Sequence, residues 1–114
     1  MTEPDMRFRK VTAIIRPDAL RAVEERLMDL GVPGVSVTRV KGFGEHASFY
    51  SPDWLLTHVR IEVFIERARA REIAEAIMEA AHTGLEGDGI VAILPVERLF
   101  HIRTRRECDH EACE

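Results

Sequence analysis

The segment "TGLEGDG", Thr83 to Gly89, places three glycines around one aspartate just before a predicted strand. Glycine adopts positive φ at little cost and has no Cβ, so backbone N–H groups in such a turn can approach a phosphate closely. The same composition also occurs in plain helix-to-strand loops, and the motif alone favours that simpler interpretation. Evidence from the rest of the chain is needed to distinguish a phosphate-binding turn from a connecting loop.

The two cysteines, Cys108 and Cys113, both lie near the end of the chain in "CDHEAC". A gap of this size can close into a small disulfide loop, which predicts a redox-sensitive tail, whereas a disordered tail is the simple alternative. With His110 the cysteines would supply three zinc ligands, but a fourth is missing and the spacing is not that of a zinc finger. We therefore predict no metal site and assign residues 106–114 to a tail.

The composition fits one cytoplasmic domain. The chain has 114 residues and 46% hydrophobic content, enough for a single core. Its 16 Lys and Arg against 20 Asp and Glu give a net charge of -4, which argues against binding to nucleic acid. No segment approaches the ~20 apolar residues of a membrane span, and the start lacks the apolar region of a secretory signal. We expect a single domain over residues 1–114, with its core at about residues 8–105 and no insertion into a membrane.

Strand and helix patterns alternate along the chain. The patterns predict strands at residues 8–17, 34–43, 59–66 and 90–96, helices at residues 18–30 and 69–82, and a short edge strand at residues 101–105. This order indicates an α+β, ferredoxin-like βαββαβ fold, in which an antiparallel sheet carries two helices on one face. The strands "VTAIIR" and "VAILPV" are apolar on both faces, so we expect an oligomer to cover the second face.

Several collinear segments resemble the PII signal-transduction proteins: "AIIRP", "GVPGVSVTRVKGFG", "VRIEV", and "TGLEGDG" followed by "PVERLFHIRT". They span roughly residues 11–105. The resemblance implies a homotrimer of ferredoxin-like subunits, with the sheets packed around the three-fold axis and an adenine nucleotide in each cleft between subunits.

The resemblance also assigns residues to this nucleotide site. One subunit would hold the base, through Gly34, Val35, Ser36, Glu62 and Phe64, with Arg103 as a charge partner. The neighbouring subunit would contribute Ile14, Gly42, Phe43 and Gly44, and the turn Gly87, Asp88 and Gly89. On this interpretation the glycines allow backbone donors to reach the phosphates.

The chain departs from the family pattern at positions that usually carry positive charge. They are occupied here by Glu45, His58, Ile90 and His101. His101 is the strongest functional candidate among the histidines, and His58 is a candidate contact for a second ligand. Because each further phosphate brings charge that these residues do not neutralise, we expect ADP and AMP to bind more tightly than ATP. No cofactor is required.

The loop at residues 44–58 is the expected contact with a protein partner. Tyr50, Trp54 and Leu55 either dock to that partner or fold back on the trimer, and the sequence favours neither. The cysteine pair is similar to one that ends PII-like proteins accompanying bicarbonate transport, and a related branch accompanies carboxysomes. This similarity implies inorganic-carbon signalling, with bicarbonate as a candidate ligand and a bicarbonate transporter or carboxysome-related protein as a candidate target.

Other functions remain open on sequence grounds. A conventional nitrogen-regulatory PII protein would bind ATP and 2-oxoglutarate. An RNA-binding module shares the order of elements, but "KGFG" ends the second predicted strand rather than lying on the third, and the first strand lacks a stacking ring. A small hydrolase would need a nucleophile and a base that spacing brings together, and we find none. We therefore expect a regulator and not an enzyme.

Overall fold

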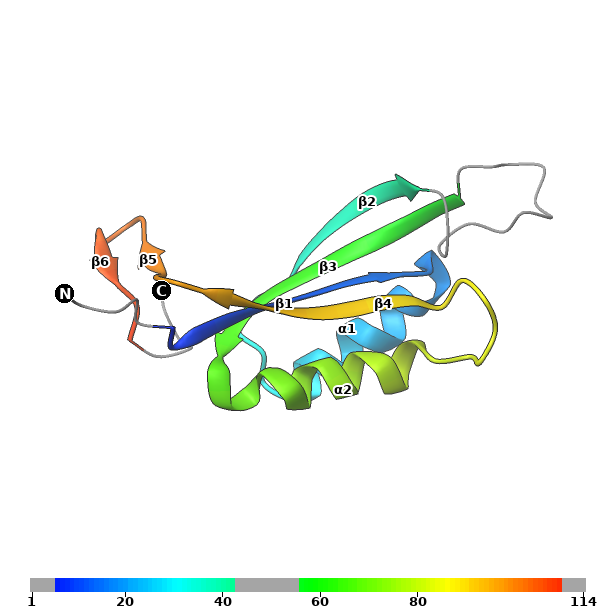
Figure 1. Ribbon diagram of the computed structural model, residues 1–114, viewed down its shortest axis with the longest axis horizontal. Helices are drawn as coiled ribbons and strands as arrows, with labels where there is room; N and C mark the ends of the chain where they lie inside the picture. The colour runs from blue at the N-terminus through cyan, green and yellow to red at the C-terminus, as the bar shows by residue number, and fades with distance from the viewer. Residues whose placement is uncertain (1–5, 43–55, 110–114) are drawn as a thin grey trace.

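The first strand, β1 (Phe8–Ile15), consists mainly of apolar residues and ends shortly before Pro17. In this computed structural model, which describes residues 6–42 and 56–109, β1 lies in the interior of the main sheet (Figure 1). Val11, Ala13 and Ile15 are buried on one face, and the residues between them point to the other. Burial thus alternates along a strand whose sequence is apolar on both faces, and the strand is covered more fully on one side.

The remaining elements follow the predicted order. They are η1 (Pro17–Ala19), α1 (Leu20–Asp29), β2 (Ser36–Gly42), β3 (Leu56–Glu66), η3 (Arg67–Arg69), α2 (Ala70–Ala81), β4 (Gly89–Val96), β5 (Phe100–His101) and β6 (Arg106–Glu107). The four long strands form a sheet in the order β2-β3-β1-β4, and every neighbouring pair is antiparallel. Both helices lie on one face of this sheet (Figure 1). The ferredoxin-like βαββαβ fold is thus confirmed.

The core lies between the sheet and the two helices. Val23 and Leu27 of α1 and Ile73 and Ile77 of α2 are fully buried. These residues recur at the three- and four-residue spacing that places them on one side of a helix. They pack against the buried side of the strands, which includes Ile61. The apolar residues of the two helices and of the buried sheet face therefore form a single core layer.

The opposite face of the sheet carries no helix. Phe64 is 46% exposed, Ile90 is 45% exposed and Leu94 is 39% exposed. The register places Ile90 beside Ile14, so apolar residues of β1 and β4 are neighbours on this face. We call this side, formed by alternate residues of β1, β3 and β4, the open sheet face. A single copy leaves much of its apolar surface in water.

Several boundaries differ from those that the sequence predicts; for example, β1 ends at Ile15, two residues early, and β2 begins at Ser36, two residues late. The predicted edge strand at residues 101–105 is wrong: Phe100–His101 and Arg106–Glu107 pair as a separate hairpin, with a turn at residues 102–105. Residues 106 and 107, predicted as tail, belong to that hairpin. β3 begins three residues earlier than predicted because Leu56, Thr57 and His58 pair with β2. Backbone pairing between strands fixes these boundaries, and no apolar pattern within one strand reports it.

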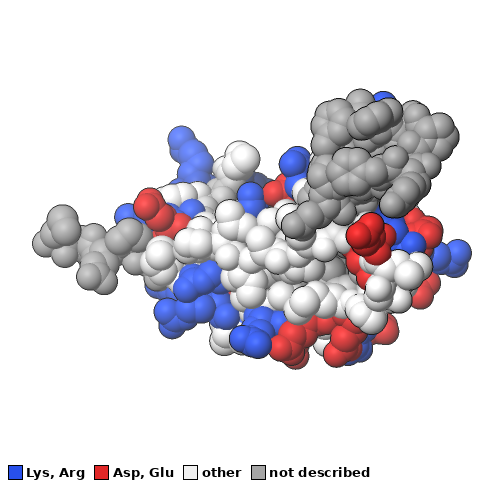
Figure 2. All heavy atoms as spheres, turned by 45° about the vertical axis from the view of Figure 1, so that its right-hand side comes forward, with Lys and Arg blue, Asp and Glu red and all other residues white. Residues whose placement is uncertain are grey.

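Charged side chains mix along the helix layer. Figure 2 shows basic and acidic side chains next to each other along the lower edge of the molecule, where the helices lie. Ion pairs such as Arg71 with Glu75 and Arg21 with Glu25 account for part of this mixing. These exposed pairs contribute little stability. The net negative charge therefore does not make this surface uniformly acidic.

Candidate functional site

The structure separates the predicted nucleotide-site residues into two groups. Gly34, Val35, Ser36, Glu62, Phe64 and His101 line one groove. Ile14, Gly87, Asp88 and Gly89 lie toward the other end of the sheet, where the loop after α2 enters β4. In the strand register, Phe64 lies opposite Lys10 and Glu62 opposite Thr12, about 13 Å and about 7 Å along β1 from Ile14. Neither Ile14 nor the glycine turn is among the residues that line the groove. One copy of the chain therefore does not assemble both groups into a single site.

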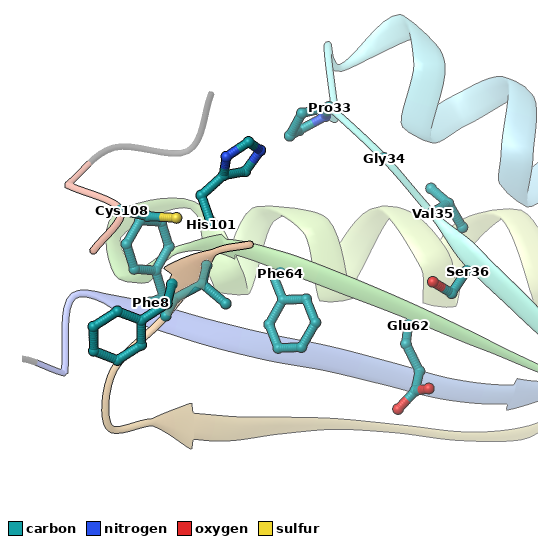
Figure 3. Close-up of a pocket in the computed structure, with 11 residues that line it drawn as sticks. Phe8, Pro33, Gly34, Val35, Ser36, Glu62, Phe64, His101 and Cys108 are labelled. Carbon is teal, nitrogen blue, oxygen red and sulfur yellow. The ribbon is translucent and has the colours of Figure 1, made fainter. Parts of the chain in front are cut away.

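The groove has a volume of about 440 Å³ and lies between the start of β2, the middle of β3 and the β5–β6 hairpin. Figure 3 shows Glu62, Phe64 and His101 placed around it. Its lining also includes Phe8, Pro33, Leu99, Phe100 and Cys108, which sequence reasoning did not assign to the site. Aromatic rings beside a hydroxyl and a carboxylate can bind a flat heteroaromatic group with a polar edge.

Glu62 is held by two cations on the open sheet face. Its Oε2 atom lies 3.1 Å from Lys10 Nζ, and its Oε1 atom lies 3.7 Å from Arg60 Nε. Alternation along β1 and β3 places all three side chains on this face. Within one copy, Arg103 is not among the described ion-pair partners of Glu62. Arg103 lies exposed in the turn between β5 and β6. Its predicted role as charge partner therefore requires a second copy of the chain.

The hairpin positions His101 in the groove. Arg98 Nε and Nη2 donate hydrogen bonds to the Glu107 carboxylate at 2.9 and 3.0 Å, and these bonds close the base of the hairpin. The Cys108 N–H donates to the Leu99 carbonyl oxygen at 2.8 Å. His101 Nδ1 is buried and has no hydrogen-bond partner among the described residues. A polar group of a bound ligand could satisfy it.

The glycine turn, residues 83–89, is organised from within by Asp88. Its carboxylate accepts hydrogen bonds from Thr83 Oγ1, from the Thr83 N–H at 2.8 Å and from the Gly84 N–H at 2.9 Å. The hydrogen bonds from the Thr83 side chain and backbone, helped by Gly84 and by the Arg16 guanidinium, lower the pKa of Asp88 from 3.8 to about 2. The aspartate of the motif is thus an ionised structural group of the turn.

Gly89 is required by strand pairing. Its φ is +104°, and a Cβ added there would lie 1.8 Å from the carbonyl oxygen of Ile14. No side chain fits at such a distance. Strand packing therefore explains the glycine at position 89 without a ligand. The sequence motif alone could not reveal this explanation. The predicted use of the turn for phosphate needs support from elsewhere.

The other predicted residues lie as follows. His58 is 3% exposed and lies within β3, not before it as predicted. Cys108 is 5% exposed and disulfide-bonded. Gly42 ends β2. The predictions on Phe43, Gly44, Glu45, Tyr50, Trp54, Leu55, His110 and Cys113 lie outside the described residues.

Within residues 6–42 and 56–109, no three His, Cys, Asp or Glu side chains are grouped so that they could hold a metal ion. No helix within those residues is long and apolar enough to span a membrane.

Comparison with known proteins gives consistent matches. Residues 8–106 match the family model "Nitrogen regulatory protein P-II". A nitrogen regulatory protein P-II of Azospirillum brasilense is 41% identical over 104 residues, which cover 85% of this chain and 93% of that protein. The P-II protein of Pasteurella multocida is 39% identical over 107 residues, covering 88% of this chain and 96% of the relative.

A plant relative and a solved structure agree with this match. A P-II homolog of Arabidopsis thaliana is 34% identical over 109 residues, and the match covers 89% of this chain and 56% of that protein. The crystal structure of Arabidopsis thaliana PII bound to citrate superposes with a TM-score of 0.79 at 34% identity. That superposition covers 93% of this chain and 92% of the solved chain.

Proposed function

Because the chain belongs to the nitrogen regulatory protein P-II family, we propose that it is a homotrimeric regulator that binds adenine nucleotides between subunits and signals to a protein partner. The observation that carries the proposal is the separation of the predicted site into two groups. A groove at one end of a subunit holds the first group, and the glycine turn at the other end holds the second. A head-to-tail ring of subunits brings one group against the other.

The open sheet face supports a trimer. Its exposed apolar residues include Phe64, Ile90 and Leu94, on the side of the sheet that no helix covers. Burial of such a surface between copies provides the main favourable free energy of association. The ring thus covers the open face and completes the nucleotide site in the same step.

The groove suits the base of a nucleotide. Phe64 and Phe100 offer aromatic faces, while Ser36 and Glu62 offer polar atoms at the same groove. A purine combines a flat ring with a polar edge, and it matches this combination. Adenine is the base that the family resemblance implies.

ADP and AMP are the preferred ligands on this proposal, and ATP binds more weakly. Ile90, directly after the glycine turn, is uncharged, and His58 is buried within β3. Neither residue supplies a permanent positive charge for a third phosphate. The segment that connects β2 and β3 carries the signal to the partner on this proposal, because ligand binding in the cleft stabilises one of its conformations.

The pathway that we propose is inorganic-carbon regulation, with bicarbonate as the second ligand and a bicarbonate transporter or carboxysome-related protein as the target. It rests on the cysteine pair at the end of the chain. Cys108 lines the groove, so the redox state of this residue can influence the bound nucleotide. The relatives are named nitrogen regulatory proteins, and this favours the second candidate: ATP and 2-oxoglutarate binding in nitrogen signalling.

Calorimetric titration of the purified protein tests these alternatives. ATP, ADP and AMP are each titrated with and without bicarbonate, and then with magnesium and 2-oxoglutarate. Tighter binding of ADP or AMP than of ATP, strengthened by bicarbonate, supports the proposal. ATP binding that is strengthened by magnesium and 2-oxoglutarate instead favours the nitrogen-regulatory alternative.

Gly34→Ala tests the groove itself. A Cβ added at Gly34 meets no atom within 4 Å, and its φ is not in the left-handed region, so the variant should fold with an unchanged melting temperature. The added methyl group narrows the groove, and we expect ADP binding to weaken by about tenfold or more. Unchanged affinity in a folded variant would show that the nucleotide does not bind in this groove.

A further inference from the structure

Arg16 lies beside the glycine turn. It follows β1 in extended conformation, with φ -68° and ψ 145°. Its Nε atom lies 3.8 Å from Asp88 Oδ1, and its Nη2 atom lies 3.4 Å from Asp18 Oδ1. Among the described residues, it is the only Lys or Arg that forms an ion pair with a residue of the turn. The guanidinium is therefore positioned by two carboxylates at this one place.

The donors of Arg16 are not used by these contacts. Both distances exceed the 2.7–3.2 Å range of N–H···O hydrogen bonds. Arg16 Nε is also buried without a hydrogen-bond partner among the described residues. A guanidinium has five N–H donors in a planar fork, a geometry that suits carboxylate or phosphate oxygens. A buried donor left without an acceptor is unfavourable, so its presence calls for an explanation.

The charge of the turn makes such a cation necessary for an anionic ligand. Asp88 is ionised within the turn, and Glu86 adds a second carboxylate. The residue after the turn, Ile90, carries no charge. Without a nearby cation, a phosphate approaching the turn meets net negative charge.

The strand geometry places the Arg16 side chain on the open sheet face. Alternation along β1 puts its side chain on the same face as Ile14, and Ile14 pairs with Ile90 on the open sheet face. This is the side on which the neighbouring subunit lies in the proposed ring. We propose that Arg16 binds a phosphate group at the glycine turn and so makes the site specific for nucleotides over nucleosides. This inference rests on the proposed function, since it names the cation of the same site.

Arg16→Gln is the direct test, with Arg21→Gln as its matched control. Arg21 has a side chain 91% exposed and pairs only with Glu25 on α1 among the described ion pairs. Calorimetry should compare ADP, adenosine and pyrophosphate with wild type and both variants. We expect Arg16→Gln to weaken ADP and pyrophosphate binding by about 10- to 100-fold, because a charge-assisted hydrogen bond is lost. Adenosine binding should stay unchanged, and Arg21→Gln should bind all three as wild type does.

The remaining outcomes separate this inference from the proposed function. Equal binding of ADP by wild type and Arg16→Gln, or equal weakening of ADP and adenosine, overturns the role of Arg16 while leaving nucleotide binding in place. Arg16-dependent binding of pyrophosphate with no binding of ADP or adenosine supports the phosphate contact and contradicts the proposed nucleotide function. If wild type binds none of the three, both fail. If Arg16→Gln does not fold, Arg16→Lys replaces it in the test, because lysine retains the positive charge. We expect Arg16→Lys to weaken ADP binding several-fold and to leave adenosine binding unchanged.

Discussion

At the scale of single residues, Asp88 is the clearest example of a motif residue with a structural role. Its carboxylate accepts the N–H groups of Thr83 and Gly84 and lies near the Arg16 guanidinium. It thereby fixes the path of the turn that precedes β4. On the proposal made above, a phosphate at this turn would be bound by backbone donors and by Arg16, since the aspartate itself repels it.

Asp88→Asn should lower stability in a pH-dependent manner. The folded-state pKa of Asp88, about 2, is below its ordinary value of 3.8. Ionised Asp88 therefore stabilises the fold above about pH 3.8, and this contribution is lost as the pH falls through 2. Thermal melting from pH 7 to pH 2 should show a lower melting temperature for the variant at neutral pH and a difference that shrinks toward pH 2.

The control for this prediction is Asp18→Asn. Asp18 also contacts Arg16, but its side chain is 72% exposed and it lies outside the turn. Asp18→Asn should therefore lower the melting temperature less than Asp88→Asn does. A difference between wild type and Asp88→Asn that is constant from pH 7 to pH 2 would contradict an electrostatic role for Asp88.

At the scale of elements, the β5–β6 hairpin connects the groove to the end of the chain. Each of its strands has two residues, and the Arg98–Glu107 ion pair closes its base. Arg105, in the turn, has a φ of +58°, a conformation that costs a non-glycine residue roughly 1–2 kcal/mol. The hairpin is therefore held by contacts at its base in spite of its turn.

Arg105→Gly should stabilise the hairpin. Glycine removes the left-handed strain but increases the conformational entropy of the unfolded chain, so we expect a net gain of up to about 1 kcal/mol in the free energy of unfolding. Denaturant unfolding measures this change. Arg106→Gly is the control, because it removes the same charge from strand β6, where glycine is unfavourable, and should destabilise. Destabilisation by both variants would show that Arg105 makes a contact that outweighs its strain.

At the scale of the whole molecule, the sheet has one covered face and one open face. The helices bury Ile61 and its neighbours completely, whereas Phe64 and Ile90 on the other side remain nearly half exposed. A substitution on the open face should therefore affect assembly more than folding. The exposed helix surface supplies the matching control.

Ala92→Glu should dissociate the proposed trimer. Ala92 is exposed in one copy and lies opposite Thr12, so the glutamate finds no cation directly across the strand. Lys10, a diagonal neighbour on β1, already pairs with Glu62, so the added charge would be buried in a trimer without a cation of its own, at a cost on the order of several kcal/mol. Analytical ultracentrifugation should show smaller particles with an unchanged circular dichroism spectrum. Met28→Glu, on α1 and 74% exposed, should keep the wild-type mass, and a trimeric Ala92→Glu would place the interface elsewhere.

The sequence by itself determined the order of strands and helices, the helix-facing core and membership of the P-II family. Val23 and Leu27, at helical spacing, and Val59, Ile61 and Val63, at strand spacing, are buried within elements that the sequence predicts. These patterns are readable because the side that each residue faces depends on local backbone geometry alone. The family resemblance added candidate residues at the groove and at the glycine turn.

Only the tertiary structure decided what depends on distant contacts. The short strands of the β5–β6 hairpin carry no periodic signal, and the burial of Phe8 and Cys108 at the groove follows from chain segments far apart in sequence. The need for glycine at position 89 comes from the carbonyl of Ile14 on another strand. The position of Arg16 beside Asp88 likewise results from the pairing of β1 with β4. Such juxtapositions are set by packing across the whole sheet, and a local stretch of sequence does not encode them.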